Sequence, residues 1–577
     1  MKKIYLIFMA IIIIVSGAYF YIRFGLLKAK DFKPDNSKSK SILDLRPAII
    51  AKLQQLVKDG SEGLYNLSIG KIDPHVLASS IDITDAVLTP DSARIKELDK
   101  AHALPDDIFK ISFSSLHLDG VGLNDVLAKD HLSLKSILVK KPFIEVYQKE
   151  RWYNKELRKK TDSLTLYKKI MKKIKSISID SIEMSDGTFI SHLFSKKYQT
   201  NKLNDVSINM KDVLIDSSTQ YDTKRFMFAK KADLSAKNLY GRTPDSLYYF
   251  KCSSIDISTA ENNLTVLNIE LHPRGSRQQF ESHLKQRKEI YNLSIPKITV
   301  SGINWWDLAN QKNIIANEAT IHNGSCDIFL DRSLPFRKVK INNFPHQILM
   351  RLPISMSITK MHIRNCNLAY SEHNPGMDKT GIIYIDDMNG EVTNITNMRE
   401  QIKKHKLLVI KSSGLFMHTI PMTNGFTFNL SKYRTGDFTM DLNVGAIDTS
   451  ILNPITEPMG EFMIRKGSIQ KGIAHVIGNN FKGGGNGELL YKDLYLVGLK
   501  KDKNKPGAIK KKSIVSFFGN VFLIKNNNPK KDNPPKVVNF NFKRESKTTF
   551  FSLVWGTIFL GILKTIGLPA SFADKPY

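Results

Sequence analysis

One spacing of apolar and polar positions recurs along most of the chain: two apolar residues one position apart, a gap of two residues, then two more apolar residues one position apart. Alternation with a period of two places apolar side chains on one face of a β-strand. The additional residue in the gap would move the second pair to the opposite face, unless the strand bends or carries a bulge there. The pattern therefore predicts strands that bend and keep one face apolar. Its copies are Ile81, Ile83, Ala86, Leu88; Ile111, Phe113, Leu116, Leu118; Leu132, Leu134, Ile137, Val139; Ile177, Ile179, Ile182, Met184; Phe250, Cys252, Ile255, Ile257; Leu293, Ile295, Ile298, Val300; and Met356, Ile358, Met361, Ile363.

The copies follow one another at uneven intervals of about 20 to about 70 residues, which excludes a solenoid of fixed period. We expect residues 62–499 to form a mainly β body, a long curved antiparallel sheet built from hairpins and crossovers. A few short basic helices are expected within this body, at Leu164–Lys173, at Gln278–Lys288 and just before Arg351.

A sheet with one apolar face has to cover that face with helices, close on itself, or bind an apolar ligand. The expected helices are too few and too short to cover it. A curved groove whose inner face holds lipid acyl chains and a closed sandwich with a dry core both explain the pattern. For the groove, the lining residues are predicted to be Ile111, Phe113, Leu116, Leu118, Leu132, Leu134, Ile137, Val139, Ile177, Ile179, Ile182, Met184, Leu293, Ile295, Ile298, Val300, Met356, Ile358, Met361 and Ile363.

Residues 27–61 combine a polar, Lys- and Ser-rich tether with an amphipathic helix. Pro47 lies in the first turn of that helix and Gly60 at its C-terminal end, which are the positions these residues favour. The helix is apolar on one side only, so we expect it to pack on the start of the β body.

The last part of the chain begins with Lys- and Asn-rich strands and loops at 500–545, and residues 546–577 form a helix and tail. Apolar residues there recur at helical spacing. The uncharged stretch Phe550–Leu563 is short for crossing a bilayer. It predicts an interfacial or groove-capping helix, with its apolar side formed by Phe551, Trp555, Phe559 and Ile562.

The N-terminus carries an uncharged apolar run, Ile4–Ile22, between Lys3 and Arg23. As a helix rising about 1.5 Å per residue, this run nearly spans a hydrocarbon core of about 30 Å. A cleaved signal peptide is the alternative, because Ser16–Ala18 resemble a cleavage site, but the apolar run continues beyond them. We therefore expect residues 1–26 to be a transmembrane anchor, with the body outside the cytoplasm.

The net charge bears on the class of binding partner, and the cysteine content bears on whether disulfides form. The formal net charge is +30, a value that first suggests nucleic acid. The basic residues are spread along the chain, however, and no nucleic-acid module is present. Anionic lipid headgroups or acidic glycans suit an exported protein, and lysines that serve solubility alone explain the charge equally well. Three unpaired thiols at Cys252, Cys326 and Cys366 are favoured over one disulfide with one free thiol.

The sequence contains no recognisable catalytic motif. The Gly483–Gly487 run lacks the ending of a phosphate-binding loop and predicts a flexible turn between strands. The 14 histidines show no metal-ligand spacing, and neither a metal nor another cofactor is predicted. Asp386–Asp387 resembles a carboxylate pair but has no partner motif. Trp305–Trp306 could stack on sugar rings or lie at an interface, although core packing is favoured. The sequence does not predict an enzyme.

Several segments resemble AsmA-like envelope proteins of the Bacteroidota. The similarity covers Ile50–Asp91 (IAKLQQLVKDGSEGLYNLSIGKIDPHVLASSIDITDAVLTPD), then ISFSSLHLDGVGLNDVL and HLSLKSILVKKPFIEVY, and later a stretch from Asn453–Pro454 through the Gly467 and Gly487 turns to LYKDL. The resemblance implies an inner-membrane anchor followed by a periplasmic β groove related to TamB and the bridge-like lipid-transfer proteins. It also implies a role in phospholipid movement or outer-membrane integrity, and it offers no catalytic residues.

Three functional hypotheses follow. In the first, a single-pass inner-membrane protein binds or conducts phospholipid or another amphiphile in a periplasmic β groove and supports outer-membrane assembly, with a possible envelope partner at its C-terminus. In the second, a non-enzymatic scaffold with a closed β core recruits assembly partners. In the third, the weakest, the chain is an exported glycan-active enzyme, for which no spaced carboxylate pair can be named.

Overall fold

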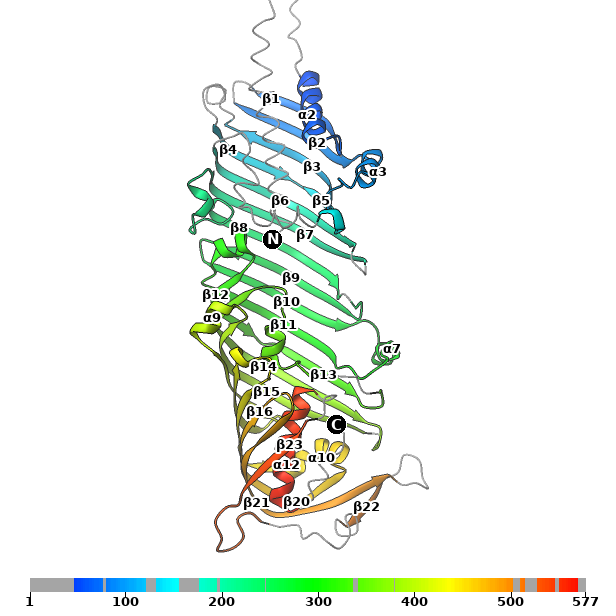
Figure 1. The fold of residues 1–577 in the computed structure, drawn as a ribbon, viewed down its shortest axis with the longest axis vertical. Coiled ribbons are helices and arrows are strands. Elements are labelled where there is room, and N and C mark those ends of the chain that lie inside the picture. Colours follow the sequence, from blue (N-terminus) through cyan, green and yellow to red (C-terminus); the bar gives the residue numbers. More distant parts are fainter. Residues whose placement is uncertain are drawn as a thin grey trace, which may run out of the picture. The chain divides into compact units, whose positions relative to one another are not determined.

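The computed structural model describes residues 46–75, 79–120, 131–154, 176–194, 198–243, 245–335, 341–377, 379–501, 509–513, 527–544 and 549–568. The chain is mainly β, and its strands belong to one large mixed sheet (Figure 1). It divides into two compact units. Unit 1 comprises residues 1–267 and 303–312, and unit 2 comprises residues 268–302 and 313–577.

The described part of unit 1 begins with a helix that packs on the first strand, as the sequence predicted (Figure 1). Pro47 lies in its first turn and Gly60 is its last residue. The elements of this unit are α2 (Arg46–Gly60), β1 (Tyr65–His75), β2 (Ser80–Pro90), α3 (Ser92–Lys100), β3 (Asp107–Asp119), β4 (His131–Lys140), β5 (Phe143–Gln148), η2 (Trp152–Asn154), β6 (Ser176–Phe194), β7 (Tyr198–Ile215), η3 (Thr219–Tyr221), β8 (Ala229–Arg242), β9 (Tyr248–Ser258) and η4 (Asp307–Gln311), and β10 (Asn263–Pro273) reaches the unit boundary.

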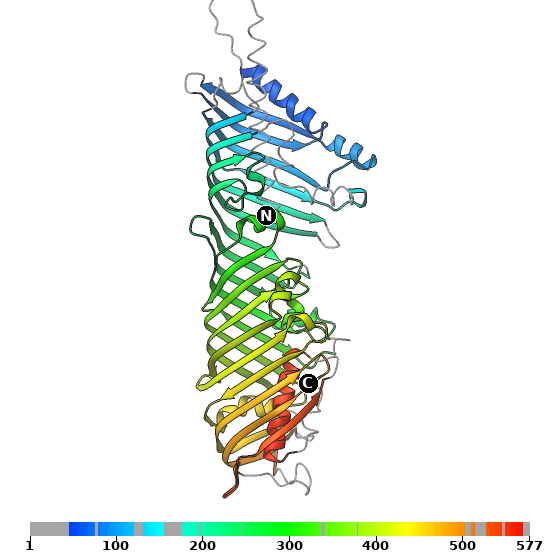
Figure 2. The same ribbon diagram turned by 60° about the vertical axis from the view of Figure 1, so that its left-hand side comes forward.

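Unit 2 contains the remaining elements, and Figure 2 shows its helix α12 lying on the inner side of curving strands. They are α7 (Arg277–Ser282), β11 (Ile290–Ser301), β12 (Ile314–His322), β13 (Ser325–Asp331), α8 (Pro345–Leu349), β14 (Met356–Asn374), β15 (Lys379–Thr396), α9 (Arg399–Lys404), β16 (Leu407–Phe416), β17 (Ile420–Asn429), η5 (Leu430–Lys432), β18 (Phe438–Val444), β19 (Ile447–Asp448), η6 (Thr449–Leu452), α10 (Asn453–Gly460), β20 (Phe462–Gly478), β21 (Lys482–Lys501), β22 (Ile509–Ser513), β23 (Val537–Lys543) and α12 (Phe550–Ile566).

The prediction of an antiparallel sheet is wrong, because the sheet is mixed. In unit 1, β4 and β5 follow each other along one side of β3, and β6 runs parallel to both. In unit 2, β14 runs parallel to β12 and β13 in the same way. Parallel neighbours need a crossover of about a dozen residues or more. The connections before β6 and β14 are therefore crossovers, and in both the sequence had predicted short basic helices.

The predicted helices fare unevenly. Leu164–Lys173 lies outside the described residues. Of Gln278–Lys288, only the first part is helical, as α7, and the helix expected before Arg351 is α8. No helix among the described residues is long and apolar enough to cross a membrane. The predicted anchor, residues 1–26, lies outside the described residues.

The predicted bends in the strands are present, and single Asp or Asn residues make them. Asp85, Asp212, Asn238 and Asn394 have left-handed φ values of 53°, 53°, 54° and 59°. Asp85 falls in the gap of one sequence copy, and Asp212, Asn238 and Asn394 oppose the gap of a copy on the neighbouring strand. Asp and Asn adopt this conformation more easily than other residues that carry a side chain. The apolar face is therefore maintained through each bend.

Candidate functional site

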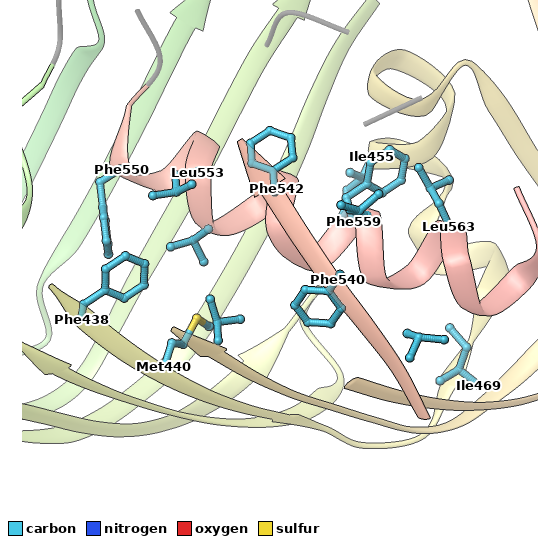
Figure 3. Packing of buried hydrophobic residues seen from close by; sticks show 14 of the residues in the cluster. Phe438, Met440, Ile455, Ile469, Phe540, Phe542, Phe550, Leu553, Phe559 and Leu563 are labelled. Atoms are coloured by element: carbon cyan, nitrogen blue, oxygen red, sulfur yellow. The ribbon is translucent and has the colours of Figure 1, made fainter. Parts of the chain in front are cut away.

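An apolar cavity of about 360 Å³ lies in unit 2 between α12 and the strands. Its volume falls within the range of roughly 300–1,000 Å³ typical of small-molecule sites. Strands from β15 to β21, with β23, form one wall, α10 forms a second, and α12 closes the third. Figure 3 shows side chains of α12 and of these strands pointing toward one another. All the lining residues belong to unit 2, so the cavity lies within one compact unit.

Helix α12 is fixed at both ends. The side chain of Thr549 accepts a hydrogen bond from the backbone N–H of Ser552 at 3.0 Å, which caps the N-terminus. Gly567, at φ 86°, ends the helix in the left-handed conformation. Near that end, Lys536 Nζ donates to the carbonyl of Lys564 and Lys564 Nζ donates to the carbonyl of Asn539. These contacts attach the helix to the β23 region.

Two glycines bring α12 close to β23. A Cβ added at Gly556 would lie 2.7 Å from the Phe542 ring, and one added at Gly561 would lie 2.8 Å from the Phe540 ring. Both distances are too short for a real side chain, so only glycine permits this approach. Leu553 and Leu563 are fully buried beside this contact. One face of α12 therefore belongs to the core.

The opposite face of α12 lines the cavity with Phe551, Trp555, Ile558 and Ile562, spaced four, three and four residues apart. These positions fall on one side of a helix. The Trp555 ring stacks on Phe559 with ring centroids 5.7 Å apart, and Phe551 is 56% exposed. Helix α12 is apolar on both sides because one side packs on strands and the other faces the cavity.

The sheet wall is apolar with few polar interruptions. Alternate residues of two strands contribute Met422 and Phe426 on β17, with Met440 and Leu442 on β18. The strands contribute Asn424 and Glu488 as polar residues, and on α12 the hydroxyl of Thr565 donates to the carbonyl of Gly561 at 2.8 Å. The lining is mostly apolar and offers space for hydrocarbon.

The prediction that Gly483–Gly487 forms a turn is wrong, because these residues belong to β21 and pair with β20 and β23. A Cβ at Gly483 would lie 2.4 Å from the hydroxyl of Thr557 on α12, and Gly487 lines the cavity. The lack of side chains at these glycines allows β21 to approach α12 closely. The glycine run was predicted to be a flexible turn, whereas its small residues are needed because α12 packs closely on the strand.

Aromatic rings hold the start of α12. Phe550 lies 4.8 Å from Phe344 and 5.2 Å from Phe438 between ring centroids. His346 is fully buried beside them, stacked on Phe428 at 4.9 Å, and neither of its ring nitrogens has a hydrogen-bond partner among the described residues. Burial lowers the pKa of His346 to about 4, against a smaller opposing effect of Asp437. The imidazole is therefore neutral at pH 7.

The predicted site residues fall into two groups. All four predicted helix residues, Phe551, Trp555, Phe559 and Ile562, lie in α12 and line the cavity. The predicted strand residues do not line it. Those in unit 1 whose side chains the structure describes, from Ile111 to Met184, are buried in one core cluster, and the side chain of Leu132 lies outside the described residues. The strand lining was missed because β17 and β18 alternate without the central gap that was used as the signal.

The predicted strand residues of unit 2 have a different environment. Leu293, Ile295, Ile298 and Val300 on β11 are all partly exposed. On β14, Met356, Met361 and Ile363 are also partly exposed, whereas Ile358 is buried. Unit 2 therefore presents an incompletely covered apolar face in addition to its cavity.

The catalytic candidates do not assemble into a site. Asp386 is hydrogen-bonded to His418 at 2.7 Å near the surface, and Asp387 occupies a bulge at φ 48°. Within the described residues no group of three or more His, Cys, Asp or Glu side chains could hold a metal ion. Trp305 meets Phe226 edge-on at 5.8 Å and packs against the unit 1 core, which confirms the packing role for Trp305. Cys252, Cys326 and Cys366 are free thiols.

No protein-family model matches this sequence, and no curated protein matches it.

Proposed function

We propose that this chain is a non-enzymatic, membrane-anchored envelope protein that binds an acyl chain of a phospholipid, or of a similar amphiphile, beneath α12. The observation that carries the proposal is the apolar cavity of about 360 Å³. A cavity with so few polar partners for water favours apolar guests. Each methylene group transferred into it from water contributes about 0.8 kcal/mol, so a single hydrocarbon chain has ample driving force.

The partly exposed face of unit 2 supports the same function. The row Leu293–Val300 on β11 keeps apolar side chains accessible. On β14, Met356, Met361 and Ile363 are partly exposed at the edge of the unit 2 core, against which they pack. Soluble proteins bury such rows or use them for binding. In the proposed function, these rows receive the acyl chains of lipid that enters or leaves the cavity.

The resemblance to AsmA-like proteins supplies the setting. It suggests an inner-membrane anchor at residues 1–26, a periplasmic body and a part in outer-membrane assembly or integrity. The uncharged run Ile4–Ile22 is the sequence feature in favour of the anchor. The excess of basic residues suits a protein that works beside anionic lipid.

Photocrosslinking with a phospholipid that carries a diazirine on one acyl chain tests the proposal directly. The full chain is purified in detergent, exchanged with the probe, irradiated and digested, and the crosslinked peptides are mapped by mass spectrometry. Crosslinks to α12 and to β17 or β18 are expected. Mapping separates lipid in the cavity from lipid around the N-terminal segment.

A matched pair of variants gives the control. Ile562→Trp adds an indole ring inside the cavity, whereas Ile477→Trp adds one at a 58% exposed position of β20. The first variant should lose most of the crosslinks to α12, and the second should keep them. A wild-type chain that is stably folded and shows no crosslinks in unit 2 would contradict the proposal and favour the closed scaffold.

A further inference from the structure

Two runs of exposed residues lie at the same end of three neighbouring strands in unit 2. Residues 351–355, just before β14, are all exposed, and so are residues 403–407, which lead into β16. Between them, β15 ends at Thr396. The large aliphatic side chains in and beside these runs are well exposed, with Ile348 48%, Leu352 42%, Ile354 49% and Leu407 48% accessible.

Two asparagines hold both runs in place. The Asn397 side chain donates to the carbonyls of Leu349 at 3.3 Å and Ile354 at 2.9 Å. The Asn394 side chain donates to the carbonyls of His405 at 2.8 Å and Leu407 at 2.9 Å. Both loops are therefore fixed to the end of β15 by side-chain hydrogen bonds, and their aliphatic residues are exposed on a built surface.

The same surface is strongly basic. Glu400 is paired with Lys403 at 2.8 Å, and it is the only acidic residue in 348–355 and 399–407. The basic residues of these two stretches are Arg351, Arg399, Lys403, Lys404 and Lys406. We call these two stretches the basic aliphatic edge.

We propose that the basic aliphatic edge is a peripheral docking surface for a bilayer that contains anionic phospholipid. Aliphatic side chains of this kind insert at the boundary between headgroups and acyl chains, while neighbouring lysines meet lipid phosphates. A protein partner is a poorer fit, because protein interfaces are enriched in aromatic residues and depleted of lysine. The edge lies on the surface, away from the cavity lining, and docking does not depend on a lipid bound beneath α12.

A fluorophore at residue 352 tests this inference. The full chain carrying Leu352→Cys is labelled with an environment-sensitive dye and mixed with vesicles of phosphatidylcholine, with or without phosphatidylglycerol, as detergent is removed. The labelled wild-type chain gives the background from Cys326, which is partly exposed. Ile477→Cys provides a control label at an exposed position of β20. We expect brighter, blue-shifted emission at 352 with phosphatidylglycerol, loss of that change at high salt, and no change at 477.

Charge reversal tests whether binding to anionic vesicles depends on the basic aliphatic edge or on the overall positive charge of the chain. Lys403→Glu, Lys404→Glu and Lys406→Glu together should reduce the signal at 352 to the level seen with phosphatidylcholine alone. The matched control reverses three exposed lysines elsewhere in unit 2, Lys466, Lys471 and Lys492, and should retain the signal. Thermal melting confirms that both triple variants are folded.

Three results would overturn docking: equal signals with both vesicle types, loss of the signal in the control triple variant, or a signal that follows protein concentration without lipid. The last would indicate contact between copies of the chain. Because the dye reports from residue 352 and the photocrosslinks report from the cavity, either proposal can fail while the other stands.

Discussion

The same spacing of apolar residues leads to different environments on β6 of unit 1 and on β11 of unit 2. In unit 1, Ile177, Ile179, Ile182 and Met184 on β6 are each at most 2% exposed. In unit 2, the equivalent row from Leu293 to Val300 on β11 is partly exposed at every apolar position. The pattern therefore determines which face of the strand is apolar, and it leaves open how that face is covered.

Segments from elsewhere in the sequence make the difference. In unit 1, Leu53 of α2, residues 226–228 and Trp305 pack against the strand rows. In unit 2, α12 covers β21 and β23, and the β11 row belongs to no core cluster of the described residues. The apolar cavity beneath α12 lies in unit 2, which is why the proposed function is assigned to that unit.

Truncation of one residue in each row should show the largest difference. Ile179→Ala removes a side chain that is 1% exposed and should destabilise the β6 region by about 3 kcal/mol. Ile295→Ala removes a partly exposed side chain and should cost about 1 kcal/mol. Local hydrogen exchange of peptides that cover β6 and β11 measures both values in the full chain.

Added phospholipid should also affect the two rows differently. Added phospholipid should slow exchange on β11 in the wild-type chain and less so in Ile295→Ala, while β6 should not respond. If the two substitutions cost the same, or if β6 responds to lipid as strongly as β11, the two faces do not differ in the way that the exposed fractions indicate.

Acid should loosen unit 2 through His346. Its folded pKa of about 4 lies below the ordinary value of 6.5, because the ring is buried. Protonation therefore favours the unfolded chain, and the contribution is fully present above about pH 6.5 and is lost as the pH falls through 4. The difference corresponds to about 3 kcal/mol. Peptides that cover the start of α12 should lose protection between pH 6.5 and pH 4, measured as their exchange rate relative to the intrinsic amide exchange rate at each pH.

His346→Phe gives the control for this effect, because a phenyl ring keeps the stack on Phe428 and cannot be protonated. The variant should lose most of the acid sensitivity at α12, and the acid response of unit 1 should be unchanged. Equal acid sensitivity in wild type and variant would assign the effect to other groups.

Much of the strand architecture could be predicted from local sequence. The apolar rows, their bends, α2 and the helix at Phe551–Ile562 all follow from spacing between near neighbours. The parallel pairs could not be predicted, since β6 and β14 each run beside two shorter strands through pairings that no local pattern specifies. Register between distant strands depends on contacts of the whole face.

The candidate site was half predictable for the same reason. The helix residues Phe551, Trp555, Phe559 and Ile562 were found because helical spacing is local. Their partners on β17 and β18 were not found, because a cavity exists only after a helix and strands far apart in sequence have met. The role of Gly483 is the clearest case, since its need for a small residue comes from Thr557 on α12.

Substitution at a bend residue should cost about the same free energy in both units. This cost is the smallest effect that we expect. Asp85 on β2 and Asp387 on β15 are exposed and have φ values of 53° and 48°. Alanine at either position should cost about 1 kcal/mol, because a Cβ disfavours the left-handed conformation and alanine lacks the polar side chain that eases it. Glycine should cost less than alanine.

At Asp387 the backbone contacts with Asn367 and Asn389 remain in every variant, so the difference between alanine and glycine isolates the conformational cost. Hydrogen exchange on β2 and β15 measures it. A cost confined to one unit would show that the bend there depends on how its face is covered, and not on local geometry alone.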